Sequence, residues 1–183
     1  NAAEKGNLKA MHFYGTKIFD GDSMNYLKRA AAEGYGKSMN EYGINLLRIL
    51  RGSPKEQNKM EAIQYIKKAM NKGFIDSFYS YAEVLMFGDD GIPMNKREGI
   101  RYMMIAALNG SINAMGKYAG LLIDGLEVEQ DVQEGIKYFK EAIDRGSLVA
   151  MNDYAYMLQS GKGVEVNYQE AIKYYKILID KGI

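Results

Sequence analysis

Few residues of this chain could carry out covalent chemistry. His12 is the only histidine among the 183 residues, and there is no cysteine. A zinc site built from histidine and cysteine therefore cannot form, and neither a disulfide nor a reactive thiol is available. A Ser-His-Asp arrangement would have to use His12, which lies in a segment with helical periodicity. No serine begins the S-x-x-K motif of serine acyl-transfer enzymes.

Two loop segments carry residues that often bind phosphate or cations. Gly161-Lys162-Gly163 does not extend to G-x-x-x-x-G-K-[ST], and no strand precedes it, so it is not a phosphate loop. Asp89-Asp90 could attract a cation, but the regular oxygen spacing of a calcium loop is missing. A solvated acidic turn is the favoured interpretation. We therefore expect no catalytic residues, no cofactor and no metal, and we expect that the chain is not an enzyme.

The dominant pattern is a repeat that closes with glycine. The spacing between successive closing glycines is 28 to 39 residues. The eighth residue after each glycine is tyrosine, and the fourth, fifth, ninth and twelfth are small or apolar, which places them on one helical face. We name this expected helix of each repeat helix A. The closing glycines are Gly6, Gly34, Gly73, Gly110, Gly146 and Gly182, and the helix A tyrosines are Tyr14, Tyr42, Tyr81, Tyr118 and Tyr154.

The second half of each repeat predicts another amphipathic helix, helix B. The eighth residue before the closing glycine is again tyrosine, and small or apolar residues stand seven, ten and eleven before it. Asparagine or aspartate precedes helix B where an N-cap is expected, and the closing glycine fits the left-handed C′ position. Gly99 and Gly135 stand inside helix B, where we interpret them as close-packing residues. The helix B tyrosines are Tyr26, Tyr65, Tyr102, Tyr138 and Tyr174, and the expected caps are Asn58, Asn95, Asp131 and Asn167.

These features together resemble the Sel1-like repeat, an α/α repeat related to the tetratricopeptide repeat. The final repeat matches the family pattern at Ala150, Tyr154, Ala155, Leu158, the loop SGKGVEVN, Ala171, Tyr174 and Gly182. The resemblance covers essentially the whole chain and implies an all-α solenoid, a right-handed superhelix of five helix-loop-helix repeats. The single solenoid over 1–183 would consist of repeats at about 1–34, 35–73, 74–110, 111–146 and 147–183. The family's frequent helix B tryptophan is tyrosine here, and the cysteines of some secreted relatives are absent.

Composition restricts the class of partner. There are 24 basic and 23 acidic residues, for a net charge of +1, which argues against a nucleic-acid partner. Ten of the 15 tyrosines occupy the expected core, so they do not predict a base-stacking surface. No apolar run reaches the length of a membrane span, and no signal peptide is recognised. Because the chain opens without methionine and stops just past a repeat boundary, we expect a piece of a longer chain. The absence of cysteine favours the cytoplasm.

The resemblance also implies a binding face. In these families helix A typically lines a concave groove, so the groove residues would stand opposite the core face, three, seven, ten and fourteen after the closing glycine, with the sixth flanking. Exposed aromatics among polar neighbours are typical of interface hot spots, and asparagine amides could hold a peptide backbone. The candidate protein-binding residues are His12, Phe13, Thr16, Asn40, Glu41, Tyr79, Glu83, Phe87, Asn113, Lys117, Asn152, Asp153 and Tyr156.

Two functions are left open by the sequence. The first is a scaffold or adaptor that holds a peptide or protein segment in the concave groove. The alternative is a regulatory repeat domain attached to a catalytic domain, such as a kinase, outside these residues.

Overall fold

The computed structural model describes residues 3, 6–17, 22–52, 56–88 and 91–183, and within these ranges helices are joined by short loops. The odd-numbered helices are the predicted helices A and the even-numbered ones the helices B, which confirms the all-α class. No described helix is long and apolar enough to cross a membrane. The helices are α1 (Leu8–Lys17), α2 (Ser23–Ala32), α3 (Gly36–Ile49), α4 (Glu56–Asn71), α5 (Asp76–Phe87), α6 (Lys96–Leu108), α7 (Ile112–Asp124), α8 (Val132–Asp144), α9 (Leu148–Ser160) and α10 (Tyr168–Asp180).

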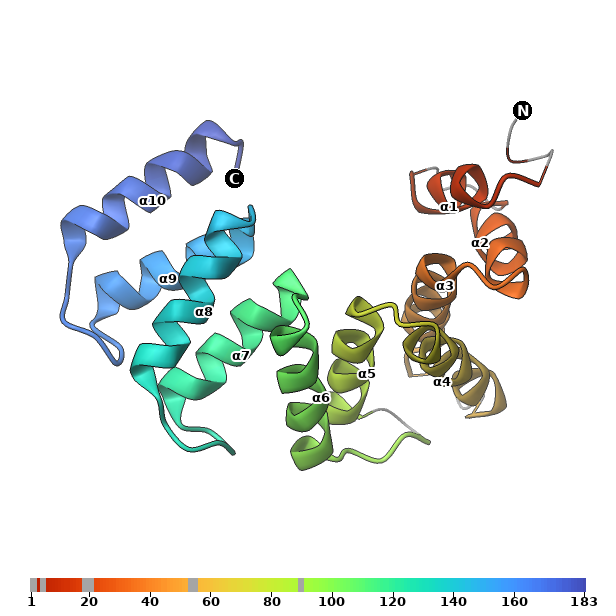
Figure 1. Cartoon of the computed structure of the whole chain (residues 1–183), viewed down its shortest axis with the longest axis horizontal. Coiled ribbons are helices and arrows are strands. Elements are labelled where there is room, and N and C mark those ends of the chain that lie inside the picture. Colours follow the sequence, from red (N-terminus) through yellow and green to blue (C-terminus); the bar gives the residue numbers. More distant parts are fainter. Residues whose placement is uncertain (1–2, 4–5, 18–21, 53–55, 89–90) are drawn as a thin grey trace. The chain divides into compact units, whose positions relative to one another are not determined.

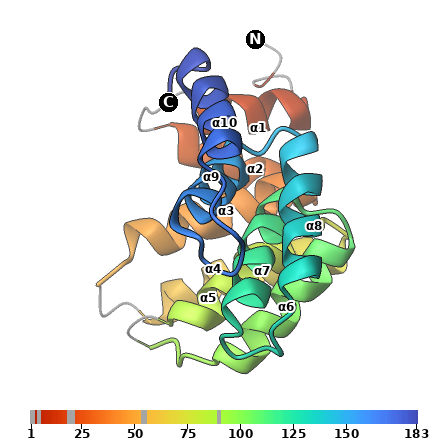
Figure 2. The ribbon, with the colours of Figure 1, turned by 90° about the vertical axis from the view of Figure 1, so that its left-hand side faces the viewer.

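The chain divides into two compact units, Asn1–Gly99 and Ile100–Ile183. In the first unit α1 packs on α2 and α3 on α4, while α3 also contacts α1 and α2. In the second unit α7 packs on α8 and α9 on α10, while α9 also contacts α7 and α8. Figure 1 shows the helices in chain order, and Figure 2 shows α8 beside α7 in the turned view. Each unit thus has the order of an α/α solenoid, in which a helix pair buries one face on the next pair.

The repeat tyrosines of helix A and helix B pack against each other. The ring centroids lie 5.5 Å apart in the Tyr118–Tyr138 pair and in the Tyr154–Tyr174 pair, both edge to face. The Tyr42–Tyr65 rings meet at 4.9 Å in the same way. Aromatic rings favour this geometry because the positive ring edge meets the negative ring face. The predicted core role is confirmed for the buried members Tyr42, Tyr81, Tyr138 and Tyr154, while their described partners are half-buried.

Three of the predicted caps start helix B as expected. The side chains of Asn95, Asp131 and Asn167 accept hydrogen bonds from the backbone N–H three residues later, at 3.1, 2.9 and 3.0 Å. The backbone N–H of each cap residue also donates to a carbonyl of the preceding helix A, as Asp131 does to Leu122 at 2.9 Å. One residue thus fixes both the start of helix B and the return of the loop onto helix A.

The predicted cap at Asn58 is wrong. Helix α4 begins at Glu56, so Asn58 lies inside the helix with an exposed side chain. Glutamate and glutamine are good helix formers, and Glu56 and Gln57 extend α4 beyond the expected start. The predicted loop Arg51–Gln57 is therefore shorter than expected by these two residues.

The closing glycines end helix B as predicted. Gly34 has φ +87°, a left-handed conformation that glycine adopts without a Cβ penalty. Its N–H donates to the Ala31 carbonyl, and the Tyr35 N–H donates to the Ala30 carbonyl, both at 3.0 Å. This is the Schellman arrangement. The turn satisfies the last carbonyls of helix B and directs the chain into the next helix A.

The helix B glycines allow close helix approach, as predicted. A Cβ at Gly135 would lie 2.6 Å from Ile123 Cγ1 and 2.9 Å from the Ala119 carbonyl oxygen. A Cβ at Gly99 would meet Met86 Cγ at 2.6 Å. Only glycine therefore fits these two crossings without a shift of the neighbouring helix.

Equivalent helix B positions differ in burial along the chain. The tenth residue before the closing glycine is buried in Ile63 and Ile100, with 6% and 7% exposure. On α10 the same position is Ile172, which is 46% exposed, and Tyr168 and Ile179 are exposed beside it on the same helix. In the described structure α10 therefore presents an uncovered apolar side.

Candidate protein-binding surface

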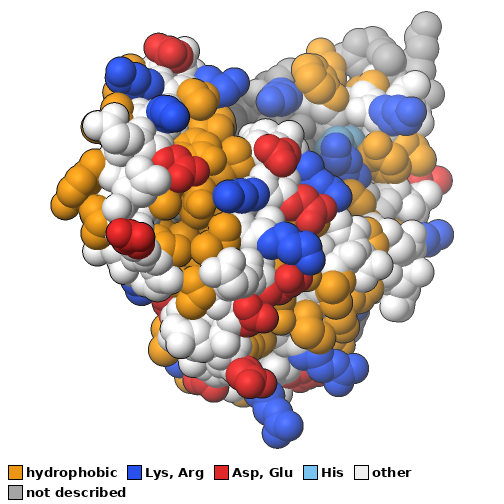
Figure 3. Space-filling view, turned by 60° about the vertical axis from the view of Figure 1, so that its left-hand side comes forward, with side chains coloured by type: hydrophobic (Ala, Val, Ile, Leu, Met, Phe, Trp, Pro, Cys, Tyr) orange, Lys and Arg blue, Asp and Glu red, His pale blue; other side chains and the backbone are white. Residues whose placement is uncertain are grey.

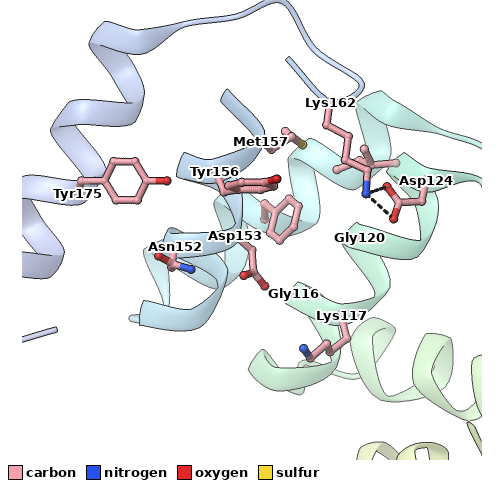
Figure 4. Close-up of a pocket in the computed structure, with 12 residues that line it drawn as sticks. Gly116, Lys117, Gly120, Asp124, Asn152, Asp153, Tyr156, Met157, Lys162 and Tyr175 are labelled. Atoms are coloured by element: carbon pink, nitrogen blue, oxygen red, sulfur yellow. Dashed lines mark hydrogen bonds and ion pairs between the residues drawn. The ribbon is translucent and has the colours of Figure 1, made fainter. Parts of the chain in front are cut away.

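Helices α7 and α9 hold most of the residues around a pocket of about 390 Å³ in the second unit. Figure 3 shows hydrophobic side chains gathered on the C-terminal unit with acidic and basic side chains bordering them, and Figure 4 shows the pocket itself. Seven lining residues come from the predicted groove face of helix A: Gly116, Lys117, Gly120 and Asp124 on α7, and Asn152, Asp153 and Tyr156 on α9. The others are Ile123, Phe139, Met157, Lys162 and Tyr175.

The base of the pocket is apolar. It is lined by Ile123, Phe139 and Met157. These three side chains are almost fully buried, so they also belong to the core of the second unit. Tyr156 is different, because it is 60% exposed although it belongs to a helix in the middle of the unit. Its ring is drawn among the other lining side chains in Figure 4. The pocket thus offers an exposed aromatic wall over a preformed apolar floor, as ligand sites commonly do.

Two glycines on α7 create the space opposite Tyr156. Gly116 and Gly120 stand one helical turn apart on the face that other helices A fill with side chains. A Cβ at Gly116 would approach Ala150 Cβ to 3.3 Å, so this glycine lets α9 pack closely on α7. A Cβ at Gly120 would meet no atom within 4 Å. The open volume therefore lies above Gly120.

The rim is charged but balanced. Lys162 Nζ lies 2.8 Å from Asp124 Oδ1, an ion pair that ties the loop after α9 to the end of α7. Lys117 and Asp153 lie on the opposite side of the pocket (Figure 4). Among the described residues neither of them makes a hydrogen bond or an ion pair. Two lysines and two aspartates thus give the rim a formal charge of zero.

A tyrosine from α10 completes the pocket lining. The Tyr175 hydroxyl donates a hydrogen bond to Gln159 Oε1 of α9 at 3.0 Å. Figure 4 shows the hydroxyl directed towards the pocket. The bond ties the Tyr175 side chain to α9.

In the first unit, two predicted groove residues belong to packed interfaces. His12 Nδ1 lies 3.1 Å from Ser38 Oγ, and the ring meets Tyr35 edge to face at 5.6 Å. Burial is the main cause that lowers the pKa of His12, and Lys37 lowers it further. Asn40 holds the equivalent position on α3 and is only 3% exposed. Its Oδ1 has no hydrogen-bond partner among the described residues.

Asn40 and Asn152 occupy the same repeat position but differ in burial. Asn40 offers almost no surface to a partner, whereas Asn152, at the same repeat position, is exposed and lines the pocket.

Among the remaining candidates of the first unit, Glu83 and Phe87 share a smaller pocket. Phe13 and Phe87 are 59% and 75% exposed. The Thr16 hydroxyl is directed back to the His12 carbonyl at 3.0 Å. Glu83 and Phe87 line a pocket of about 240 Å³ together with Leu47, Arg48, Arg51, Val84, Gly88 and Ile92.

Two half-buried candidate residues, Glu41 and Tyr79, have raised pKa values. Burial raises the pKa of Glu41, and its effect outweighs the opposing effects of Lys37 and Arg48. Burial also raises the pKa of Tyr79, and a hydrogen bond with Glu83 adds to the shift. Tyr79 is therefore tied to its own helix, which makes it a poorer contact for a partner than the exposed aromatics.

Some of the residues predicted from the sequence line the larger pocket, and others do not. Lys117, Asn152, Asp153 and Tyr156 come together, while Asn113 lies on α7 outside the lining. Phe139 and Met157 have the spacing of core residues, so nothing marked them as a pocket floor. The available signal was the pair Gly116 and Gly120, which stands where other helices A carry side chains.

The described residues contain no cluster of three or more histidine, cysteine, aspartate or glutamate side chains that could hold a metal ion. His12 is paired with Ser38 and lies on a different unit from the larger pocket. The Asp89-Asp90 turn falls outside the described residues. What the larger pocket can supply is an apolar floor, an aromatic wall and unpaired charges at its rim.

Comparison with known proteins agrees with this description. The Sel1 repeat profile matches residues 36–74, 79–111, 112–147 and 148–183, which is more than half of the chain. Residues 1–35 lie outside these matches, although α1 and α2 pair as the other helices do. A search of curated proteins found no match.

Solved structures show the same fold. A Sel1 repeat protein from Oxalobacter formigenes superimposes with a TM-score of 0.79 at 18% identity, over 98% of this chain and 76% of that one. The protein c5321, a protective antigen of uropathogenic Escherichia coli strains with an SLR fold, gives 0.71 at 24% identity, over 99% of this chain and 40% of that one. At these identities the likeness concerns the fold alone.

Proposed function

The chain belongs to the Sel1 repeat family, and on that premise we propose that it is a protein-interaction module that holds a partner segment on the faces of its helices A. Sel1 repeat proteins are generally protein-interaction scaffolds, and their fold is a repeat scaffold without a catalytic role.

The observation that supports the α7–α9 surface is the exposed ring of Tyr156 over a pocket with a preformed floor. Interface hot spots are enriched in tyrosine and sit in pockets that exclude water on binding. A ring that is 60% exposed in the middle of a unit contributes little to folding. The free energy from burying this ring against a partner would therefore contribute almost entirely to binding.

The nature of the partner follows from the rim charges. A nucleic-acid surface needs a basic excess that contacts phosphates. The rim of this pocket is balanced, as is the whole chain at +1. A protein or peptide segment is the partner class that this surface fits.

The test compares two tyrosines of the same unit. Tyr156 and Tyr168 are 60% and 61% exposed, but only Tyr156 lines the pocket. Peptides are selected on the wild-type protein from a phage-displayed random nine-residue library, and their affinities are measured by fluorescence anisotropy. We expect Tyr156→Ala to weaken binding at least about tenfold, because a hot-spot truncation costs roughly 2 kcal/mol.

Tyr168→Ala is the matched control and should bind like the wild type. Both variants should keep the wild-type melting temperature, since exposed positions change stability by about 0.5 kcal/mol or less. Equal loss of binding in the two variants, or no selectable peptide, would argue against this surface.

A further inference from the structure

Gly120 is an unexplained glycine in the middle of a helix. Glycine in a helix interior is about 1 kcal/mol less favourable than alanine. Apart from Gly36, which begins α3, the other glycines inside the described helices have a packing reason. A Cβ would lie 2.4 Å from Leu27 Cγ at Gly15, 2.7 Å from the Ala62 carbonyl oxygen at Gly43, and 3.3 Å from Ala150 Cβ at Gly116.

At Gly120 the helix tolerates any Cβ, because the nearest heavy atoms are more than 4 Å away. Packing within the chain therefore does not require glycine there. What glycine does is leave the pocket open, since a side chain at this position would project into the volume between α7 and Tyr156. The feature that remains to explain the glycine is a group from outside the chain.

The chemistry of the pocket identifies that group. The floor of Ile123, Phe139 and Met157 is apolar and already buried. The rim charges sum to zero, and Lys162 and Asp124 neutralise each other at 2.8 Å. A charged group on the apolar floor would lose its hydration away from the charges of the rim. A neutral, apolar group has no such cost.

The size of the pocket limits the group to a side chain. At about 390 Å³ it is near the lower end of the roughly 300–1,000 Å³ typical of ligand pockets. It can hold one large side chain with its adjoining backbone, but no helix or domain.

We infer that the pocket receives one large apolar side chain, such as leucine, methionine or phenylalanine, from a partner peptide segment, which enters over Gly120 against Tyr156. Gly120 then sets the size of the side chain that is accepted. Lys117 and Asp153, which have no partners among the described residues, contact the polar backbone or side chains on either side of the anchor. This inference rests on the proposed function, since it names the part of the partner that the surface recognises.

The first experiment uses minimal probes. Protein labelled with ¹³C at the methionine methyl groups is titrated with N-acetyl-leucine methylamide, N-acetyl-lysine methylamide or N-acetyl-glutamate methylamide. Met157 lines the pocket and serves as the reporter, while Met39 in the first unit serves as the reference. We expect the leucine probe to shift the Met157 signal at concentrations where the charged probes do not, and to leave Met39 unchanged.

The second experiment fills the pocket. In Gly120→Met a long side chain occupies the space that the anchor would take. We expect it to weaken the binding of the selected nine-residue peptides and of the leucine probe at least about tenfold. One extra or missing methylene group in an apolar pocket already changes the discrimination between ligands by about 10–200-fold. The variant should melt no lower than the wild type, because methionine favours the helix and its Cβ meets no atom within 4 Å.

Gln133→Met is the matched control. It introduces the same side chain at an exposed position of α8, a helix B of the same unit, that does not line the pocket. It should bind the peptides and the leucine probe like the wild type.

The outcomes separate the anchor from the general function. If the peptides lose affinity for Tyr156→Ala but bind Gly120→Met normally, the inference of an apolar anchor over Gly120 is wrong, while the proposed function still holds. A Met157 signal that responds equally to the charged probes would also overturn it. If no peptide binds the wild type and no probe moves Met157, both proposals are wrong.

Discussion

At the scale of single residues, His12 is the group whose ionisation is coupled to folding near neutral pH. Its ring packs between Ser38 and Tyr35, and Lys37 lies close enough to oppose a positive charge. Burial, followed by Lys37, lowers the pKa of His12 in the folded chain below its ordinary value of 6.5. The unfolded chain therefore binds more protons than the folded chain once the pH falls below that value.

We therefore predict that the first unit becomes less stable as the pH is lowered from about 7.5 towards 5, across the ordinary histidine pKa of about 6.5. The contribution of His12 is fully present above 6.5 and is lost as the pH falls towards the lower, folded pKa. Melting temperatures measured across this range should fall more steeply for the wild type than for His12→Gln, which cannot titrate. Parallel curves for the two proteins would show that His12 is not responsible.

At the scale of helices, the caps control where each helix B begins. Asp131 caps α8 through its side chain, whereas Asn58 lies exposed inside α4. We predict that Asp131→Ala lowers the free energy of unfolding by about 1 kcal/mol, as loss of an N-cap does. Asn58→Ala should leave it unchanged or raise it by a few tenths of a kcal/mol, because alanine favours a helix interior. Urea denaturation of both variants checks the difference, and an equal loss in both would contradict the assignment of the caps.

The order of the helices could be predicted from the sequence because the residue types at the core positions repeat from unit to unit. Tyr154 and Tyr174 recur at fixed distances from the closing glycines, and burial selects for this periodicity. The start of α4 could not be predicted, since Glu56 and Asn58 are both compatible with the first turn of a helix. Local propensity, rather than the repeat, decided between them.

The pocket was less predictable than the face that contains it. Periodicity assigns Tyr156 to the side opposite the core, but it does not show whether the surface there forms a pocket. Phe139 and Met157 serve the core and the pocket floor at once, and their spacing shows only the first role. The pairing of repeat tyrosines, such as Tyr42 with Tyr65, likewise depends on the crossing of two helices in space.

At the scale of the whole molecule, substitutions at equivalent repeat positions affect the stability differently, depending on how far the side chain is buried. Ile63 on α4 and Ile172 on α10 occupy the same position, but Ile63 is 6% exposed and Ile172 is 46% exposed. We predict that Ile63→Lys destabilises the first unit by several kcal/mol, because it buries a charge and removes core packing. Ile172→Lys should change the stability by about 0.5 kcal/mol or less. Thermal denaturation followed by circular dichroism provides the comparison, and a similar drop in both variants would mean that α10 is covered.

The open position at Gly120 has a consequence for how such a chain can change over generations. Alanine there would strengthen α7 by about 1 kcal/mol and cause no clash. Selection for heat resistance alone would therefore replace this glycine readily, and each larger replacement would narrow the pocket. The residue at position 120 therefore affects both the stability of α7 and the size of the pocket. A single substitution there can alter the range of accepted partners while the fold itself becomes more stable.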